Sequence, residues 1–303
     1  MRRLFIVPDY YRKGTWYRYF IDRICKDFGF IWVFESDVAL TADTEVVIAF
    51  AMPHFNWVDE IIPELLKLPK SVKLISWPTD LHCGDLTSFT VVRCKEEALG
   101  LFERADLILS PYYNRMMEEY SKFVGKYKYV PWTFVPQKAY LKYTLNEVPH
   151  LQCLQLGQCS PHIYPLRHRI MRAAGKDGAI RYSHGLKEAR YVKWLHHHVC
   201  GIVDVGHNEA LQPKYFEIPA VGSLLLGRKT NLVDDLGFVP YKHYVPFDGD
   251  DVFDKAHEIV ANPEKFLEIR KAGMKFVREE HNFERRLEVL YPVLEKLIPR
   301  GVK

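Results

Sequence analysis

Short apolar segments alternate with amphipathic segments of helical length along most of this sequence, and this alternation restricts the fold more than any other feature. The first half places apolar segments at 3–8, 30–35, 45–50, 72–77 and 105–110. Several are apolar along their whole length and rich in β-branched residues, which is typical of strands buried on both faces of a parallel sheet. Strands separated by helices predict an α/β protein with parallel sheets covered by helices.

The alternation stops once, at residues 131–150, and then restarts. This stretch contains three prolines and has mixed polarity, and proline lacks the backbone N–H that helices and sheets use. Further strands are predicted at 151–157, 178–183 and 200–206, with helices between them. A chain of 303 residues suits two domains of about 150 residues each. We therefore expect two α/β domains joined by a proline-bearing linker.

Composition and charge narrow the class of protein. Apolar residues make up 48% of the chain and charged residues 26%, which is normal for a soluble globular protein. The formal net charge of +4 suits an anionic ligand such as a nucleotide phosphate, but it is too small to indicate nucleic-acid binding by itself. No stretch reaches the ~20 apolar residues of a membrane span, and the N-terminal apolar run reads as a strand and not as a signal peptide.

The cysteines and a run of three histidines do not form a metal-binding pattern. The six cysteines are scattered, without a C-x-x-C pair or zinc spacing, so reduced thiols in a cytoplasmic protein are expected. Residues 196–198 are all histidine. Successive residues on a helix point about 100° apart, so these three side chains cannot share one metal ion from a regular helix.

Three common nucleotide or nucleophile motifs are missing. Neither half has a G-x-G-x-x-G after its first strand, and the chain has no G-x-x-x-x-G-K-S/T and no G-x-S-x-G. Their absence argues against nicotinamide and flavin enzymes, P-loop ATPases and hydrolases with a nucleophile elbow. A phosphate-bearing ligand must be held in another way.

Two glutamates, Glu209 and Glu217, flank the start of the predicted helix "PKYFEIPAVG", which precedes the apolar strand "SLLLG". The N-terminus of a helix offers free N–H groups and the positive end of the helix dipole to an anion. A carboxylate can accept hydrogen bonds from the vicinal hydroxyls of a ribose or hexose. The pair suits a nucleotide sugar, although from the spacing alone two solvated surface acids are the commoner interpretation.

The segment "EALQPKYFEIPAVGSLLLG" resembles the E-x7-E region of retaining family 4 glycosyltransferases, in which small residues, a glycine and a strand follow the second glutamate. The C-terminal half is most similar to the glycosyltransferase domain of spore maturation protein B-like proteins. The matching segments are "YPLR" (164–167), "HGLKEARYVKWL" (184–195), "KYFEIPAVGSLLL" (214–226) and the tail 261–290, with "SWPTDLH" (76–82) and 105–120 in the first half.

This resemblance implies the GT-B fold, in which two Rossmann-like domains with parallel sheets face a central crevice. We expect an N-terminal acceptor-side domain at 1–135 and a C-terminal nucleotide-sugar domain at 136–280. A final helix at 281–303 is expected to cross back to the first domain. The implied reaction moves a hexosyl or pentosyl group from a UDP- or GDP-sugar to an acceptor glycan, lipid, protein or modified nucleic acid. It is expected to retain the sugar's configuration and to need no metal or other cofactor.

The same resemblance assigns the donor side of the site. Glu217 is expected to bind the ribose and Glu209 the donor sugar. The diphosphate needs cations. Arg167 of "YPLR" is the first candidate, with an arginine on the helix surface as the alternative, and Lys214 is the second. The family's arginine–lysine pair after the first strand of this domain is replaced here by "LGQCSPHIYP" (156–165).

Further candidates lie in loops after other strands. His184 and Gly185 fall where the family places the nucleotide base, and Gly14 allows the backbone to approach the phosphates closely. On the acceptor side, Asp80 and His82 follow the predicted strand 72–77. His82 could orient the acceptor or the donor sugar and Asp80 could accept a proton from the acceptor hydroxyl, with a turn cap and a structural histidine as the alternatives.

Two other functions remain open from the sequence. One is a GT-B-like module that binds a nucleotide sugar or glycan without catalysis. The other is a sugar epimerase of the same fold, which would also need acid and base groups in its crevice. Stabilisation by nucleoside diphosphates and hydrolysis of the donor sugar distinguish these cases.

Overall fold

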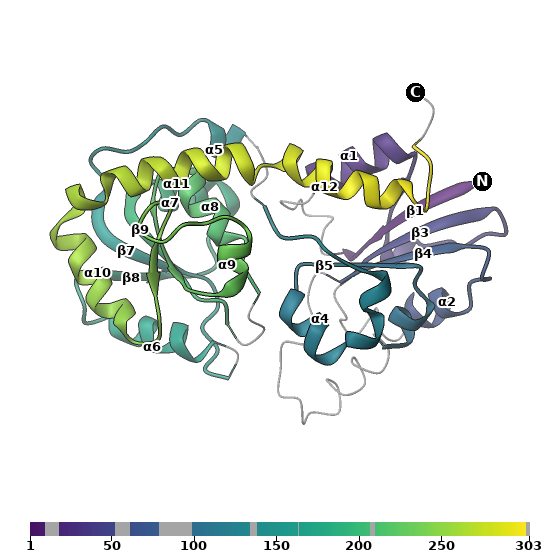
Figure 1. Ribbon diagram of the computed structural model, residues 1–303, viewed down its shortest axis with the longest axis horizontal. Helices are drawn as coiled ribbons and strands as arrows, with labels where there is room; N and C mark the ends of the chain where they lie inside the picture. Colours follow the sequence, from purple (N-terminus) through teal and green to yellow (C-terminus); the bar gives the residue numbers. More distant parts are fainter. Residues whose placement is uncertain are drawn as a thin grey trace. The chain divides into compact units, whose positions relative to one another are not determined.

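The computed structural model describes residues 1–9, 18–51, 61–78, 99–133, 138–162, 164–206 and 210–300. The chain divides into two compact units (Figure 1). Unit 1 comprises Met1–Pro131 together with Arg286–Lys303, and unit 2 comprises Trp132–Arg285. Across the described ranges, we find no helix with the length and apolar character needed to span a bilayer.

Unit 1 is built on a parallel sheet with the strand order β2-β1-β3-β4-β5-β6. The four consecutive residues from Leu4 to Val7 are completely buried, as expected for a strand with helices on both sides. The strands are β1 (Arg2–Val7), β2 (Ile31–Phe34), β3 (Thr44–Ala51), β4 (Lys73–Pro78), β5 (Leu107–Ser110) and β6 (Tyr127–Tyr129).

Helices cover both faces of this sheet. They are α1 (Arg18–Phe28), α2 (Ile62–Leu66), α4 (Tyr113–Glu119) and, from the far end of the chain, α12 (Phe283–Glu295). Figure 1 shows α1 and α12 on one face and α2 and α4 on the other. The ring of Tyr291 in α12 packs edge-on against Phe28 at 5.1 Å between centroids, and its hydroxyl donates to Asp27. The last helix is thus part of the unit 1 core.

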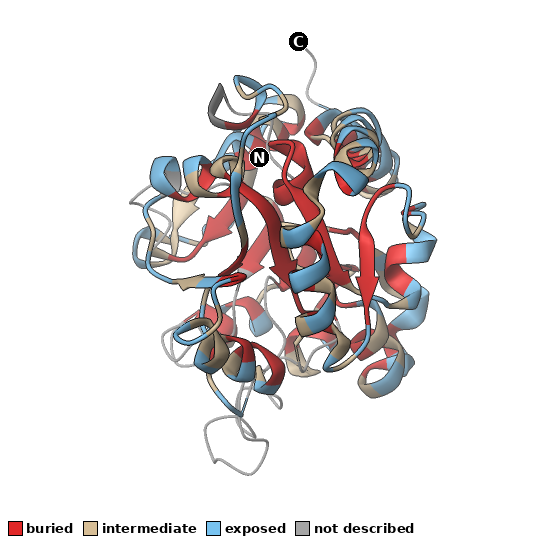
Figure 2. Cartoon of the chain, turned by 90° about the vertical axis from the view of Figure 1, so that its left-hand side faces the viewer, coloured by how far each residue is buried: buried red, intermediate tan, exposed pale blue. Residues whose placement is uncertain are grey.

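Unit 2 contains a second parallel sheet, with the order β11-β10-β9-β7-β8. Its strands are β7 (His150–Leu156), β8 (Ile180–Ser183), β9 (His198–Val203), β10 (Leu224–Arg228) and β11 (Val245–Phe247). Figure 2 shows buried strands between helices whose outer surfaces are exposed. All six residues of β9 are buried, because β9 lies at the centre of the sheet.

The helices of unit 2 are α5 (Lys138–Leu141), α6 (Pro165–Ala174), α7 (Glu188–His197), α8 (Lys214–Ala220), α9 (Asn231–Asp235), α10 (Asp251–Ala261) and α11 (Leu267–Glu280). α6 and α10 pack on one face of the sheet, where Leu166, Ile170, Val252 and Ile259 join its core. α7 and α8 pack directly on the other face, against β9 and β10, and α5 lies against both helices. The carboxyl ends of β7 and β9 therefore meet the N-terminal ends of α6 and α8.

Several local features differ from what the sequence indicates. The three histidines do not share a helix, because His198 begins β9; no metal-binding group of His, Cys, Asp or Glu forms among the described residues. A short helix, α9, escaped prediction; the hydroxyl of Thr230 caps it by accepting from the Val233 N–H.

The close packing of α11 gives a testable expectation. A Cβ atom added at Gly273 would lie 2.4 Å from the carbonyl oxygen of His243, which is backbone and cannot rotate away. We expect Gly273→Ala to lower the free energy of unfolding by about 1–3 kcal/mol, measured by urea denaturation. Gly175→Ala is the control, because that glycine has a φ of −73° and open space around it. It should be neutral or stabilising by up to about 1 kcal/mol; equal losses in both variants would contradict the packing argument.

Candidate functional site

At the carboxyl edge of the unit 2 sheet, a glycine with positive φ follows each of three neighbouring strands. Gly157 follows β7 with a φ of +104°, and Gly185 and Gly206 follow β8 and β9 with φ of +67° and +68°. Gly157 is the most constrained of the three. A side chain there would be strained by the backbone conformation, and its Cβ would lie 2.8 Å from Nζ of Lys214. Because residue 157 has no side chain, the ammonium group of Lys214 can occupy this space.

Lys214 is the first residue of α8 and reaches back to the end of β7. Its Nζ donates to the Leu156 carbonyl oxygen at 2.6 Å. Burial, and then the positive charge of Arg167, lower the pKa of Lys214 to about 7, while Glu217 and Cys159 oppose that shift. A lysine that is only partly protonated near neutral pH is rare and marks a candidate functional group.

Arg167, in the first turn of α6, is a buried residue with only 3% of its surface exposed. Its Nη2 donates to the Asp204 carbonyl oxygen at 2.5 Å, and its guanidinium lies 4.0 Å from the centre of the Tyr164 ring. Its Nε is buried without a hydrogen-bond partner among the described residues. The alternative of a surface arginine on a helix is therefore wrong, and a buried cation with a spare donor lies at this edge.

Glu217 is also buried, with 2% of its surface exposed. Its Oε2 accepts a hydrogen bond from the hydroxyl of Tyr191 in α7 at 2.5 Å. Burial, and then the charge of Glu217, raise the pKa of Tyr191 well above its ordinary value, so the phenol stays protonated as the donor. This contact fixes the carboxylate from the α7 side. The solvated-acid alternative does not hold for Glu217.

Asp204 and Arg228 complete the charged cluster. Asp204 follows β9 and is buried, and its carboxylate pairs with Nη1 of Arg228 at 3.3 Å. The cluster of Arg167, Lys214, Arg228, Asp204 and Glu217 thus holds three basic and two acidic groups. Arg167, Asp204 and Glu217 are buried, whereas Lys214 and Arg228 are partly exposed. Buried charges are costly unless they are paired. The cluster has one more basic than acidic group, at the edge where open α/β sheets bind ligands.

The remaining sequence-predicted residues lie apart from this cluster or outside the described residues. His184 is exposed after β8, with its ring 6.3 Å from that of Tyr182, and Gly185 follows it with no atom within 4 Å of its would-be Cβ. Gly14, Asp80, His82 and Glu209 all lie outside the described residues.

Two functional candidates had escaped prediction from the sequence. Asp204 had a readable signal, since it is a lone carboxylate directly after an apolar strand, where parallel sheets place ligand-binding side chains. Tyr191 had none, because a tyrosine on an amphipathic helix is usually core. Its pairing with Glu217 depends on the way α7 and α8 approach each other.

The segment that contains this site matches a known protein family. Residues 144–291 match the family described as glycosyl transferase-like. No curated protein sequence matches the chain. The matched segment contains β7 to β11 and every member of the charged cluster.

Several solved structures have a similar fold. An alpha-glucosyltransferase in complex with UDP-glucose and DNA containing an abasic site is 10% identical with a TM-score of 0.62, over 97% of this chain and 99% of that one. Sucrose-phosphate synthase from Thermosynechococcus elongatus is 13% identical with a TM-score of 0.57, over 84% and 73%. TarM is 9% identical with a TM-score of 0.56, over 83% and 55%. The two parallel α/β sheets are those of the GT-B fold.

The Tyr191–Glu217 contact predicts a measurable loss of stability. Tyr191→Phe removes only the hydroxyl that donates to a desolvated carboxylate, so we expect the free energy of unfolding to fall by about 1–3 kcal/mol. Tyr244→Phe is the matched control, because Tyr244 is completely buried and its hydroxyl has no hydrogen-bond partner in the described part of the chain. Urea denaturation should show little change for the control. A Tyr191→Phe variant as stable as the wild type would refute the contact's role.

Proposed function

We propose that this protein is a glycosyltransferase that moves a sugar from a nucleoside diphosphate donor to an acceptor hydroxyl. The observation that carries the proposal is the grouping of Lys214 with the buried Arg167 and Glu217, at the carboxyl edge of the sheet in the segment matching the glycosyl transferase-like family. Similar folds occur in complex with UDP-glucose or UDP. A UDP-sugar is therefore the donor favoured over a GDP-sugar.

The cluster has the parts that a nucleoside diphosphate needs. Lys214 would exchange the Leu156 carbonyl for a phosphate oxygen, and the spare Nε–H of Arg167 points to a second cationic contact. Glu217, oriented by Tyr191, would accept hydrogen bonds from the ribose hydroxyls. The backbone around His184 and Gly185 would receive the base. Glu209 and Gly14 keep their proposed roles at the donor sugar and the phosphates.

Catalysis at this site would depend on stabilising the negative charge of the leaving nucleoside diphosphate. The bond between the anomeric carbon and the diphosphate oxygen breaks as the acceptor oxygen bonds to that carbon. The nucleoside diphosphate leaves with charge that Lys214 and Arg167 stabilise. In the retaining course proposed here, the acceptor proton passes to the departing phosphate oxygen on the same face. Asp80 and His82 are proposed to orient the acceptor, and no metal is assigned a role.

The resemblance to retaining family 4 enzymes and to spore maturation protein B-like proteins supports this course. The four cysteines that the structure describes are free thiols, in keeping with the proposed cytoplasmic location. The ligands in the similar structures differ: one structure contains DNA with an abasic site, and another contains Fondaparinux, alpha-GlcNAc-glycerol and UDP. The acceptor of this protein is proposed only as a hydroxyl group.

Glu217→Gln tests the donor grip. The substitution removes the charge that strengthens hydrogen bonds to ribose hydroxyls, and such bonds contribute about 1.5–3 kcal/mol. We expect UDP to stabilise the wild type in a thermal-shift panel of nucleoside diphosphates and to bind the variant about tenfold to hundredfold more weakly by calorimetry. The exposed Glu258 of α10 provides the control Glu258→Gln, which should bind UDP normally. Absence of stabilisation of the wild type by any nucleoside diphosphate would sink the proposal, whereas binding without donor hydrolysis or transfer would indicate a non-catalytic module.

Lys214 makes UDP binding depend on pH. In the free protein its pKa lies at about 7, and a diphosphate beside it favours the charged form and raises that pKa. Binding should therefore take up a proton above pH 7, and affinity should fall by up to about tenfold per pH unit as pH rises. Calorimetry at pH 8 in buffers of different ionisation enthalpy measures this uptake. Lys214→Gln should abolish it, and the exposed-lysine control Lys265→Gln should retain it. Equal uptake in wild type and Lys214→Gln would refute the assignment.

A further inference from the structure

Positive charge is concentrated in one part of unit 2. Residues 150–203 contain eight Lys and Arg and two Asp and Glu, a net charge of +6, whereas the rest of the chain contains 34 Lys and Arg and 36 Asp and Glu, a net charge of −2. The modest net charge of the whole chain therefore hides a strongly basic segment. That segment spans β7 to β9 and includes the edge strand β8.

Basic residues occur on both helices beside β8 and at their ends. Arg172 lies in the last turn of α6, and Lys176 follows that helix. Lys187 is the N-cap residue of α7, and Arg190 and Lys193 lie three positions apart within α7, so these two share one helix face. Arg181 lies on β8 between the two helices. We name the set the β8-edge strip, and all its members are exposed. It consists of Arg172, Lys176, Arg181, Lys187, Arg190 and Lys193.

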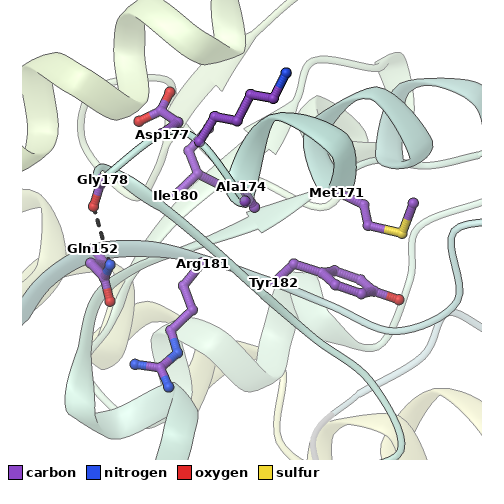
Figure 3. Close-up of a pocket in the computed structure, with 10 residues that line it drawn as sticks. Gln152, Met171, Ala174, Asp177, Gly178, Ile180, Arg181 and Tyr182 are labelled. Carbon is purple, nitrogen blue, oxygen red and sulfur yellow. Dashed lines mark hydrogen bonds between the residues drawn. The ribbon is translucent and has the colours of Figure 1, made fainter.

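Contacts link the strip around the sheet edge. Lys176 and Arg181 line a cavity of about 540 Å³ beside β8, together with Gln152 and Tyr182, and Figure 3 shows this cavity with Arg181 extending from β8. On the α7 side, the guanidinium groups of Arg181 and Arg190 lie 4.6 and 5.8 Å from the Trp194 ring. The strip therefore runs from α6 across β8 to α7.

All six members of the strip are basic, and Asp177, which lines the same cavity, pairs with His257. None of its six members forms an ion pair with a side chain that the structure describes, and like charges three or four positions apart on a helix repel each other. Charged residues on an edge strand can prevent strand pairing, but that purpose explains only Arg181. Like charges on both flanking helices and at their ends indicate a surface suited to an extended polyanion.

We propose that the β8-edge strip binds the phosphodiester backbone of a nucleic acid. α6 and α7 lie on opposite faces of the sheet, so the strip curves around an edge, which a flexible strand can follow and a flat bilayer cannot. A lipid-binding surface also needs exposed apolar side chains to insert. Among the described residues, none of the exposed large hydrophobic residues lies on α6, β8 or α7, and Leu151 on the neighbouring strand β7 is the exposed one within 150–203. The inference goes beyond the proposed sugar transfer and does not rest on it.

Binding of a fluorescein-labelled single-stranded 20-mer of DNA and of its duplex, followed by fluorescence anisotropy over a series of NaCl concentrations, tests the proposal. The strip variant is Arg181→Gln, Arg190→Gln and Lys193→Gln together. The control removes the same charge from exposed positions of the short 3-10 helix η5 (Pro263–Phe266) and of α11, toward the other edge of the sheet. It combines Lys265→Gln, Lys271→Gln and Lys275→Gln. The strip variant should bind at least tenfold more weakly, and its salt slope should be shallower by about 2, at about 0.7 per lost phosphate contact on a single strand. The control should stay within about twofold of the wild type.

Three outcomes would overturn the proposal. The first is a wild type that shows no salt-dependent binding to either DNA. The second is an equal loss in the strip and control variants, which would reflect net charge alone. The third is binding to phosphatidylserine vesicles but not to DNA. Thermal shifts with UDP, measured on the same variants, separate this result from the donor site. A strip variant that is still stabilised by UDP but binds DNA more weakly supports the proposal. If UDP does not stabilise the wild type, the proposed function fails, but the DNA-binding result is unaffected.

Discussion

The unit 2 site depends on cations held against backbone carbonyl oxygens at the ends of two strands. Lys214 donates to Leu156 at the end of β7, and Arg167 donates to Asp204 just after β9. These contacts fix α8 and α6 to the edge of the sheet. The carboxylates of Glu217 and Asp204 offset part of the cost of burying positive charge. The remaining excess of cationic donors is the property that makes this edge suited to an anion.

The fold could be predicted from the sequence because parallel strands are buried on both faces. The uninterrupted apolar residues of β1 and β9 leave few alternatives to a central strand. The architecture of two parallel sheets and the GT-B fold are confirmed. Arg167, Lys214 and Glu217 were reached through a resemblance in the order of motifs, and the structure brings these three residues together. Their individual roles stay predictions.

Contacts between distant segments lay beyond prediction. The linker 131–150 contains α5 and is held by α11, since Arg270 donates to the Asn146 carbonyl and Arg278 to that of Tyr143. Neither arginine differs in its local sequence from a solvated helix residue. The contact of Tyr191 could not be predicted either, because its hydroxyl meets the Glu217 carboxylate only through the packing of α7 against α8. α9 spans five residues, too few for a periodic apolar pattern to show.

The path of the chain sets an order for its folding. Unit 2 is one continuous segment, whereas unit 1 needs both Met1–Pro131 and Arg286–Lys303. Arg3 in the first strand donates to the carbonyl of Pro299, a partner 296 positions away. During synthesis the first sheet must wait for the last helix to leave the ribosome, while unit 2 can complete its core earlier. The unit that is translated first is therefore the last to be finished, and until then its α1 face lacks the helix that covers it.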